Sequence, residues 1–187
     1  MVSRARPRAR EPAGWAAAAP ALTVPLVETP EQPSKAPLWI GAAITAAAAI
    51  FFPRIQGIRD EGESWWRLVI FLVPQDTEGL VLVPLVILLT VGLFAVVGRW
   101  AWRGNSAGNR PAKAGLVSSV LGILGVVAFF LSAPIVLGGL GVTLGIEGRR
   151  RARAAGGSKL ATAAIVVGAL AFAEGAAIWV FGEELGI

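Results

Sequence analysis

The sequence of 187 residues contains no cysteine and no histidine, and only 16% of its residues are charged. Without cysteine there are no disulfides and no thiol chemistry, and without histidine there is no imidazole base and none of the usual zinc sites. A soluble domain carries about 25% charged residues and roughly 45–50% apolar ones. This chain is 55% hydrophobic, with a mean hydropathy of +0.67. We therefore predict an integral membrane protein.

The apolar residues are concentrated in runs that charged residues separate. The hydrocarbon core of a bilayer is about 30 Å thick, so a spanning helix needs ~20 mostly apolar residues. One uncharged stretch of 33 residues, 114–146, is too long for one crossing, and Pro134 divides it into a hairpin at Ser132. The predicted fold class is an all-α membrane protein with about five transmembrane helices. The predicted helices are 38–53, 79–98, 115–132, 134–147 and 160–182.

Three further segments complete the predicted domain organisation. Residues 1–36 are rich in arginine and proline without periodicity, which predicts a disordered cytoplasmic tail, available to a protein partner. A cleaved signal peptide is the alternative, but prolines interrupt its apolar part. Residues 65–73 form an apolar stretch too short to span, within the acidic loop that joins the two helices of the 37–113 region. They predict an interfacial or re-entrant helix on the outer face, and residues 183–187 predict an outer tail.

The basic residues indicate an orientation, because short loops rich in lysine and arginine stay in the cytoplasm. The tail 1–36 carries five of them, the loop 99–113 four, and the loop 148–159 five. The loop 53–78 has three against five acids, and the end of the chain has none. Five crossings from a cytoplasmic N-terminus put every strongly basic segment inside and the C-terminus outside. Six of the seven tryptophans fall at the predicted interfaces, which favours the same arrangement.

The last three predicted helices carry small residues at spacings of three and four. Such stripes let membrane helices pack closely. We therefore predict a compact three-helix unit at 114–182, although glycine and alanine that are merely abundant in this region would give a similar pattern. The stripes are Gly115, Ser118, Gly122 and Gly125; Gly138, Gly141 and Gly145; and Ala164, Gly168, Ala171 and Gly175.

This region also carries motifs of a known family. They are Leu121-Gly122-Ile123-Leu124-Gly125, Ser132-Ala133-Pro134, Leu144-Gly145-Ile146, the basic run 149–153 and Gly156-Gly157. Together they resemble domain of unknown function 4190, over about residues 112–182. The resemblance implies an integral membrane protein of glycine-rich antiparallel helices, common in GC-rich bacteria, and hence a bacterial cytoplasmic membrane. It implies no activity, no cofactor and no functional residues.

Glu174 is the one ionisable residue inside a predicted span. A charge at the centre of a membrane helix costs ~2.5–3.5 kcal/mol on insertion scales, so such residues are candidates for function. Three threonines are predicted at a similar depth: Thr45, Thr90 and Thr143. We predict a mid-membrane polar cluster of Glu174 with Thr143, joined by Thr90 or Thr45. The alternatives are threonines bonded to their own helices, and a Glu174 that is neutral or reaches water beside Gly175.

The basic run after the fourth predicted helix also has two interpretations. Beside a membrane helix, attraction to anionic headgroups at ~1 kcal/mol per residue explains it better than nucleic-acid binding. We assign this headgroup and topology role to Arg149, Arg150, Arg151, Arg153 and Lys159.

The sequence contains no phosphate-binding loop, no dinucleotide motif and no nucleophile–base pair. We therefore expect no catalytic residue, no cofactor, no metal and no nucleic-acid partner. The lipid bilayer is the expected partner, and the oligomeric state does not follow from the sequence. The predicted function is a non-enzymatic accessory, scaffold or envelope-associated subunit. The alternative is a small transporter or channel component that uses Glu174.

Overall fold

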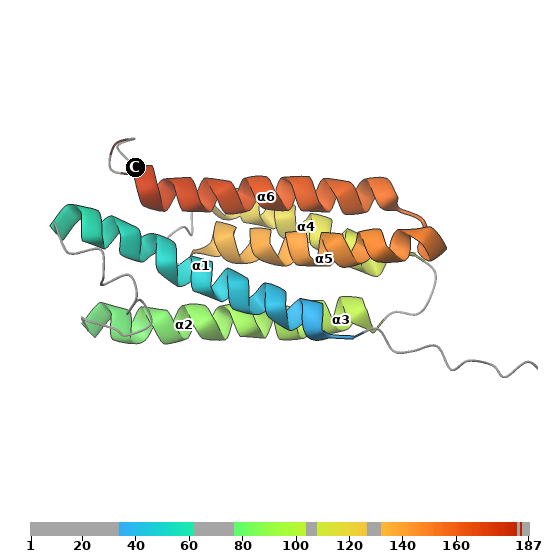
Figure 1. Cartoon of the computed structure of the whole chain (residues 1–187), viewed down its shortest axis with the longest axis horizontal. Helices are drawn as coiled ribbons and strands as arrows, with labels where there is room; N and C mark the ends of the chain where they lie inside the picture. The colour runs from blue at the N-terminus through green and yellow to red at the C-terminus, as the bar shows by residue number, and fades with distance from the viewer. Residues whose placement is uncertain (1–33, 62–76, 104–107, 127–131, 183, 185–187) are drawn as a thin grey trace, which may run out of the picture. The chain divides into compact units, whose positions relative to one another are not determined.

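The computed structural model describes residues 34–61, 77–103, 108–126, 132–182 and 184, which are all-α and contain five helices (Figure 1). The predicted all-α fold and the number of helices are confirmed. The interfacial helix expected at 65–73 and most of the two expected tails, 1–36 and 183–187, lie outside these residues. The helices are α1 (Ala36–Glu61); a continuous run of α2 (Thr77–Leu93), the π turn η2 (Phe94–Gly98) and α3 (Arg99–Trp102); α4 (Arg110–Leu124); α5 (Ala133–Ala155); and α6 (Ser158–Phe181).

Three of the five helices are long and apolar enough to cross a membrane. The segments are Ala36–Ile55, Leu80–Trp102 and Ser158–Phe181. The described part of α4 has only 15 residues. The apolar part of α5, residues 133–146, is about 21 Å long at 1.5 Å per residue, which is shorter than the ~30 Å core of a bilayer. The structure therefore supports three crossings by length and composition, where the sequence predicts five.

Several predicted helix ends are wrong because charged residues were taken as boundaries. Helix α5 passes through the predicted basic loop to Ala155, since arginine and alanine are good helix formers. It ends only at Gly156 and Gly157, whose φ angles of +71° and +78° favour glycine. Helix α1 likewise continues through Pro53 to Glu61, beyond its predicted end at residue 53.

Helix α4 begins at Arg110, five residues before its predicted start. Asn109 caps it, because its side chain accepts a hydrogen bond from the backbone nitrogen of Ala112 at 3.3 Å. Pro111 occupies the first turn, where a missing N–H costs nothing. The predicted end of this helix, residues 127–132, falls mostly outside the described residues.

Helices α4, α5 and α6 pack through their small residues, and α5 contacts both of the others (Figure 1). A Cβ atom built on Gly138 of α5 would lie 2.6 Å from the backbone oxygen of Gly168 of α6. One built on Gly115 of α4 would lie 3.0 Å from the backbone oxygen of Gly141. The backbones therefore approach so closely that a methyl group at these positions forces them apart. Gly125 is the loosest member of the stripes, with its nearest neighbour atom at 3.8 Å.

The N-terminus of α5 is buried deep in the helix bundle. Ser132 precedes it with a left-handed backbone (φ 53°), and its hydroxyl donates a hydrogen bond to the backbone oxygen of Ala49 of α1 at 3.0 Å. Pro134 lies against Gly175 of α6. Ala49 and Gly175 each lie six residues, or about 9 Å, inside the nearer end of their candidate spans. The α5 start thus lies within the length of the α1 and α6 candidate spans, and its irregular backbone is buried inside the protein.

Candidate functional site

Basic residues gather at one end of the described helices, which we call the basic end (right in Figure 1). This end comprises the start of α1, all of α3, the start of α4, the end of α5 and the start of α6. In the described ranges the opposite end has only two basic positions, Arg54 and Arg59, both late in α1. The ten basic residues of the basic end are Lys35, Arg99, Arg103, Arg110, Lys113, Arg149, Arg150, Arg151, Arg153 and Lys159.

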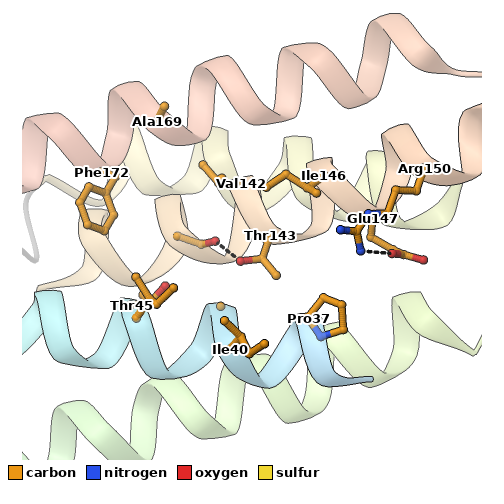
Figure 2. Close-up of a pocket in the computed structure, with 13 residues that line it drawn as sticks. Pro37, Ile40, Thr45, Val142, Thr143, Ile146, Glu147, Arg150, Ala169 and Phe172 are labelled. Atoms are coloured by element: carbon orange, nitrogen blue, oxygen red, sulfur yellow. Dashed lines mark hydrogen bonds and ion pairs between the residues drawn. The ribbon is translucent and has the colours of Figure 1, made fainter. Parts of the chain in front are cut away.

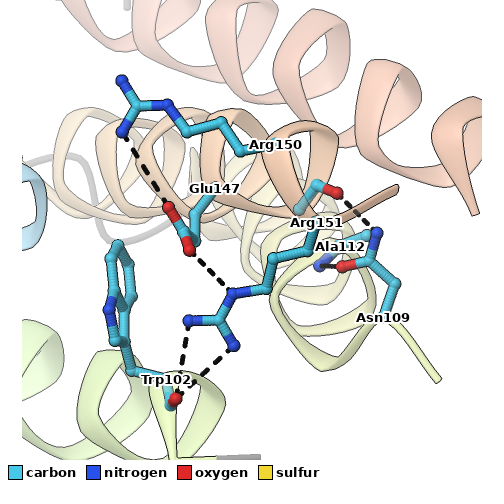
Figure 3. A network of polar contacts seen from close by, with 7 residues as sticks. Trp102, Asn109, Ala112, Glu147, Arg150 and Arg151 are labelled. Carbon is cyan, nitrogen blue, oxygen red and sulfur yellow. Dashed lines mark hydrogen bonds and ion pairs between the residues drawn. The ribbon is translucent and has the colours of Figure 1, made fainter. Parts of the chain in front are cut away.

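A partly buried ion pair lies at the basic end, between Glu147 and Arg151 of α5 (Figure 3). Arg151 Nε donates to Glu147 Oε1 at 2.7 Å, and only 8% of the Glu147 side chain is exposed. The Arg151 guanidinium also donates to the backbone oxygen of Trp102 at 3.4 and 3.5 Å, and it lies 5.4 Å from the indole ring centre. It therefore joins α5 to α3 by a charge-assisted and cation–π contact.

This geometry corrects the role predicted for Arg151. Its side chain is 19% exposed and is held by Glu147 and by the backbone of Trp102, so it links helices rather than binding headgroups. Arg149, Arg150, Arg153 and Lys159 are exposed, as that role requires. The indole Nε1 of Trp102 is buried and has no hydrogen-bond partner among the described residues.

Asn109 makes a second link at the same end, between α4 and α5 (Figure 3). Its side-chain nitrogen donates to the backbone oxygens of Gly148 at 2.5 Å and Gly156 at 3.0 Å. It thus supplies a donor to the carbonyl of Gly156, the residue that ends α5, and adds a bond to the carbonyl of Gly148 within that helix, while its own oxygen caps α4. Sequence reasoning missed both Glu147 and Asn109. The i, i+4 spacing of Glu147 and Arg151, and an asparagine just before Arg110-Pro111, were the available signals.

An apolar groove of about 580 Å³ is lined by residues of α1, α5 and α6 (Figure 2). Its walls include Ile40 and Ile44 of α1, Val142 and Ile146 of α5, and Phe172 of α6. Both isoleucines of α1, and Ile146, are exposed, so the groove is open at the surface of the protein. Glu147 and Arg150 line one end of the groove, and this end lies at the basic end of the molecule.

Helices α1 and α5 contact each other beside this groove through two reciprocal glycine–threonine pairs. Gly41 of α1 faces Thr143 of α5, and Thr45 of α1 faces Gly139 of α5. The Thr143 hydroxyl donates to the backbone oxygen of Gly139 at 2.8 Å, so it is satisfied within its own helix. Each threonine therefore fills the space that a missing side chain leaves on the other helix.

The structure does not bring the four residues of the predicted polar cluster together. Thr45 and Thr143 line the groove. Thr90 is buried in α2, and its hydroxyl donates to the backbone oxygen of Val86 at 2.8 Å. Glu174 is partly exposed on α6, is not part of the groove wall, and has no hydrogen bond to any of the three threonines in the described structure. Thr90 and Thr143 depart from the predicted cluster because their hydroxyls are bonded to the backbone of their own helices.

Comparison of the chain with protein-family models, with curated proteins and with solved structures finds no match. The resemblance to domain of unknown function 4190 over residues 112–182 therefore stays a prediction. The charge distribution, the close-packed helices and the groove are the observations from which function can be inferred.

Proposed function

We propose that the chain is a multi-pass protein of a bacterial cytoplasmic membrane that acts as a non-enzymatic accessory, scaffold or envelope-associated subunit. The observation that carries the proposal is the combination of an apolar outer surface with a single basic end. Large apolar side chains are exposed along the candidate spans, Leu88 of α2, Ile44 of α1 and Leu170 of α6 among them. An exposed apolar surface of this kind is unfavourable in water and suits the hydrocarbon core of a membrane.

The basic end is the proposed cytoplasmic end, because lysine and arginine near the ends of spans are retained inside. In this arrangement α1, α2–α3 and α6 cross the membrane, and α4 and α5 enter it as a hairpin from the cytoplasmic face. The start of α4 and the end of α5 both lie at the basic end. They are therefore on the same face if the hairpin crosses fully, as in the five-crossing prediction, and also if it stops within the membrane. The N-terminus is therefore inside and the C-terminus outside in both cases.

The scaffold role is supported by the way the central helices are held. Backbone atoms of α4, α5 and α6 are in contact at Gly115, Gly138 and Gly168, which leaves little freedom for rocking or sliding. The links made by Asn109 and Arg151 fix the ends of α3, α4 and α5. The arginine-rich sequence of residues 1–33 joins α1 at the same end, and we assign to it the attachment of a protein partner.

Cross-linking of the full-length chain in its native membrane, followed by purification in gentle detergent, tests the scaffold role. We expect a protein partner in constant ratio to the chain. Replacing Arg4, Arg6, Arg8 and Arg10 by serine should remove this partner without changing the amount of chain in the membrane. Recovery of the wild-type chain alone would contradict the role and leave the membrane location unaffected.

One observation favours transport as the second candidate function. Glu174 lies within a candidate span, about 10 Å from the end of α6 at 1.5 Å per residue, and it has no ion-pair partner among the described residues. Acidic side chains at such depth line substrate or ion paths in many membrane proteins. A flux measurement on the purified chain, given below, decides between the two functions.

A further inference from the structure

We propose that the groove between α1, α5 and α6 is a binding site for one anionic phospholipid. The acyl chain lies along the apolar wall, and the headgroup phosphate binds the guanidinium of Arg150. This inference rests on the proposed insertion of the chain in a membrane.

The groove has the size and polarity of a lipid site. It extends along α5 from Gly139 to Arg150, a rise of about 17 Å at 1.5 Å per residue, and its volume is about 580 Å³. Five of its thirteen lining residues are isoleucine, valine or phenylalanine, and Pro37 and Ala169 add to the apolar wall (Figure 2). An apolar slot of this length with one cationic end matches the shape and charge of an acyl chain joined to a phosphate.

Arg150 is the cation best placed to bind that phosphate. Its side chain is 61% exposed, and the nearest carboxylate oxygen, Glu147 Oε2, is 3.9 Å from its Nη1. The other oxygen of Glu147 is held by Arg151 at 2.7 Å (Figure 3). Arg151 therefore offsets much of the negative charge of Glu147 and leaves most of the hydrogen-bonding capacity of Arg150 available.

The position of the groove along the helices supports the same ligand. Its charged end is at the basic end of the molecule, where the proposed orientation places the cytoplasmic headgroup layer. Its apolar end, at Phe172, lies well inside the α6 candidate span. Basic pockets between membrane helices on the cytoplasmic side are typical sites for anionic headgroups.

The test uses the full-length chain in nanodiscs that contain equal amounts of phosphatidylglycerol and phosphatidylcholine with identical acyl chains. Native mass spectrometry after release from the disc counts the lipids that each chain retains. We expect one retained lipid, with phosphatidylglycerol preferred. Arg150→Gln should reduce this preference about fivefold, the effect of one basic residue near an anionic headgroup. Arg103→Gln, which changes an exposed arginine of the basic end that is not part of the groove wall, should leave the preference unchanged.

A second pair of variants tests the acyl-chain part of the site. Ile44→Trp fills the groove and should lower retention of both lipids, whereas Leu88→Trp changes an exposed side chain of α2 that is not part of its wall and should not. Equal loss of the preference in Arg150→Gln and Arg103→Gln, or full retention in Ile44→Trp, would overturn the site. Incorporation of the chain into the discs is measured separately, so an inserted chain that retains no lipid disproves the site and not the membrane location.

Discussion

Gly41 of α1 lies directly against Thr143 of α5, and a Cβ atom added to the glycine would come within 2.7 Å of the threonine Cγ2 atom. The contact joins the first helix to the close-packed unit of α4, α5 and α6, and the same two helices repeat it with the partners exchanged, at Thr45 and Gly139. Thr143 can therefore occupy its position only because Gly41 has no side chain.

We expect Gly41→Ala to lower the free energy of unfolding by about 1–3 kcal/mol, because the new methyl group overlaps the threonine side chain. Thr143→Ala removes the overlapping Cγ2 and Oγ1 atoms, so the double variant should recover much of this loss. Thermal unfolding in detergent of the wild type, both single variants and the double variant measures the coupling. Additive losses would show that the two residues do not meet.

Gly138→Ala should be more damaging than Gly41→Ala, at about 3 kcal/mol. Its methyl group meets the backbone of Gly168 and Phe172 at 2.6 and 2.7 Å, and backbone atoms cannot rotate away as a side chain does. Gly92→Ala is the matched control, because a Cβ at that position of α2 has nothing within 4 Å. The same melting experiment ranks the three variants, and a Gly138→Ala chain as stable as Gly92→Ala would refute the close packing.

Breaking the Glu147–Arg151 pair should destabilise the basic end. Arg151→Met leaves the buried Glu147 carboxylate without its closest cation, and we expect a loss of about 2–4 kcal/mol. Glu147→Gln in the same chain removes the stranded charge and should restore part of the stability. Arg149→Met, at an exposed position, should change stability by less than about 0.5 kcal/mol. If Arg151→Met behaves like Arg149→Met, the ion pair does not hold α5 to α3.

A substitution at Glu174 distinguishes the proposed scaffold function from the transport alternative. Under the scaffold proposal, the chain in liposomes conducts no more protons or cations than empty liposomes do, and Glu174→Gln leaves both folding and partner recovery unchanged. Flux dyes sensitive to pH and to K⁺ provide the measurement. A wild-type flux that Glu174→Gln abolishes would establish the transport alternative.

The sequence predicted the helices best where long apolar runs decide the structure, as in α2–α3 and α6. It failed at the end of α5, because an arginine run ends an apolar stretch without ending a helix. The stop depends on the backbone freedom of Gly156 and Gly157. The small-residue stripes were visible because helix geometry fixes which residues share a face.

The groove and the contact of the ion pair with α3 depend on approaches between helices that no local pattern reveals, although the i, i+4 spacing of Glu147 and Arg151 indicates the pair itself. Glu147 follows an apolar run in the sequence but is buried, and Arg151 beside it contacts Trp102 of α3, which lies 49 residues earlier in the chain. Gly41 and Thr143 are far apart in the chain, and nothing in either segment specifies the other. The mid-membrane polar cluster was inferred from depth alone. Depth does not determine which way a side chain faces around its helix.

Site-directed cysteine labelling tests the central claim, that the basic end faces the cytoplasm and that an odd number of helices crosses the membrane. The chain has no native cysteine, so Lys113→Cys, Arg153→Cys and Glu184→Cys each carry a single thiol. We expect a membrane-impermeant maleimide to label position 184 in intact cells, and positions 113 and 153 only after permeabilisation. Labelling of position 113 or 153 in intact cells, or protection of position 184, would contradict the account.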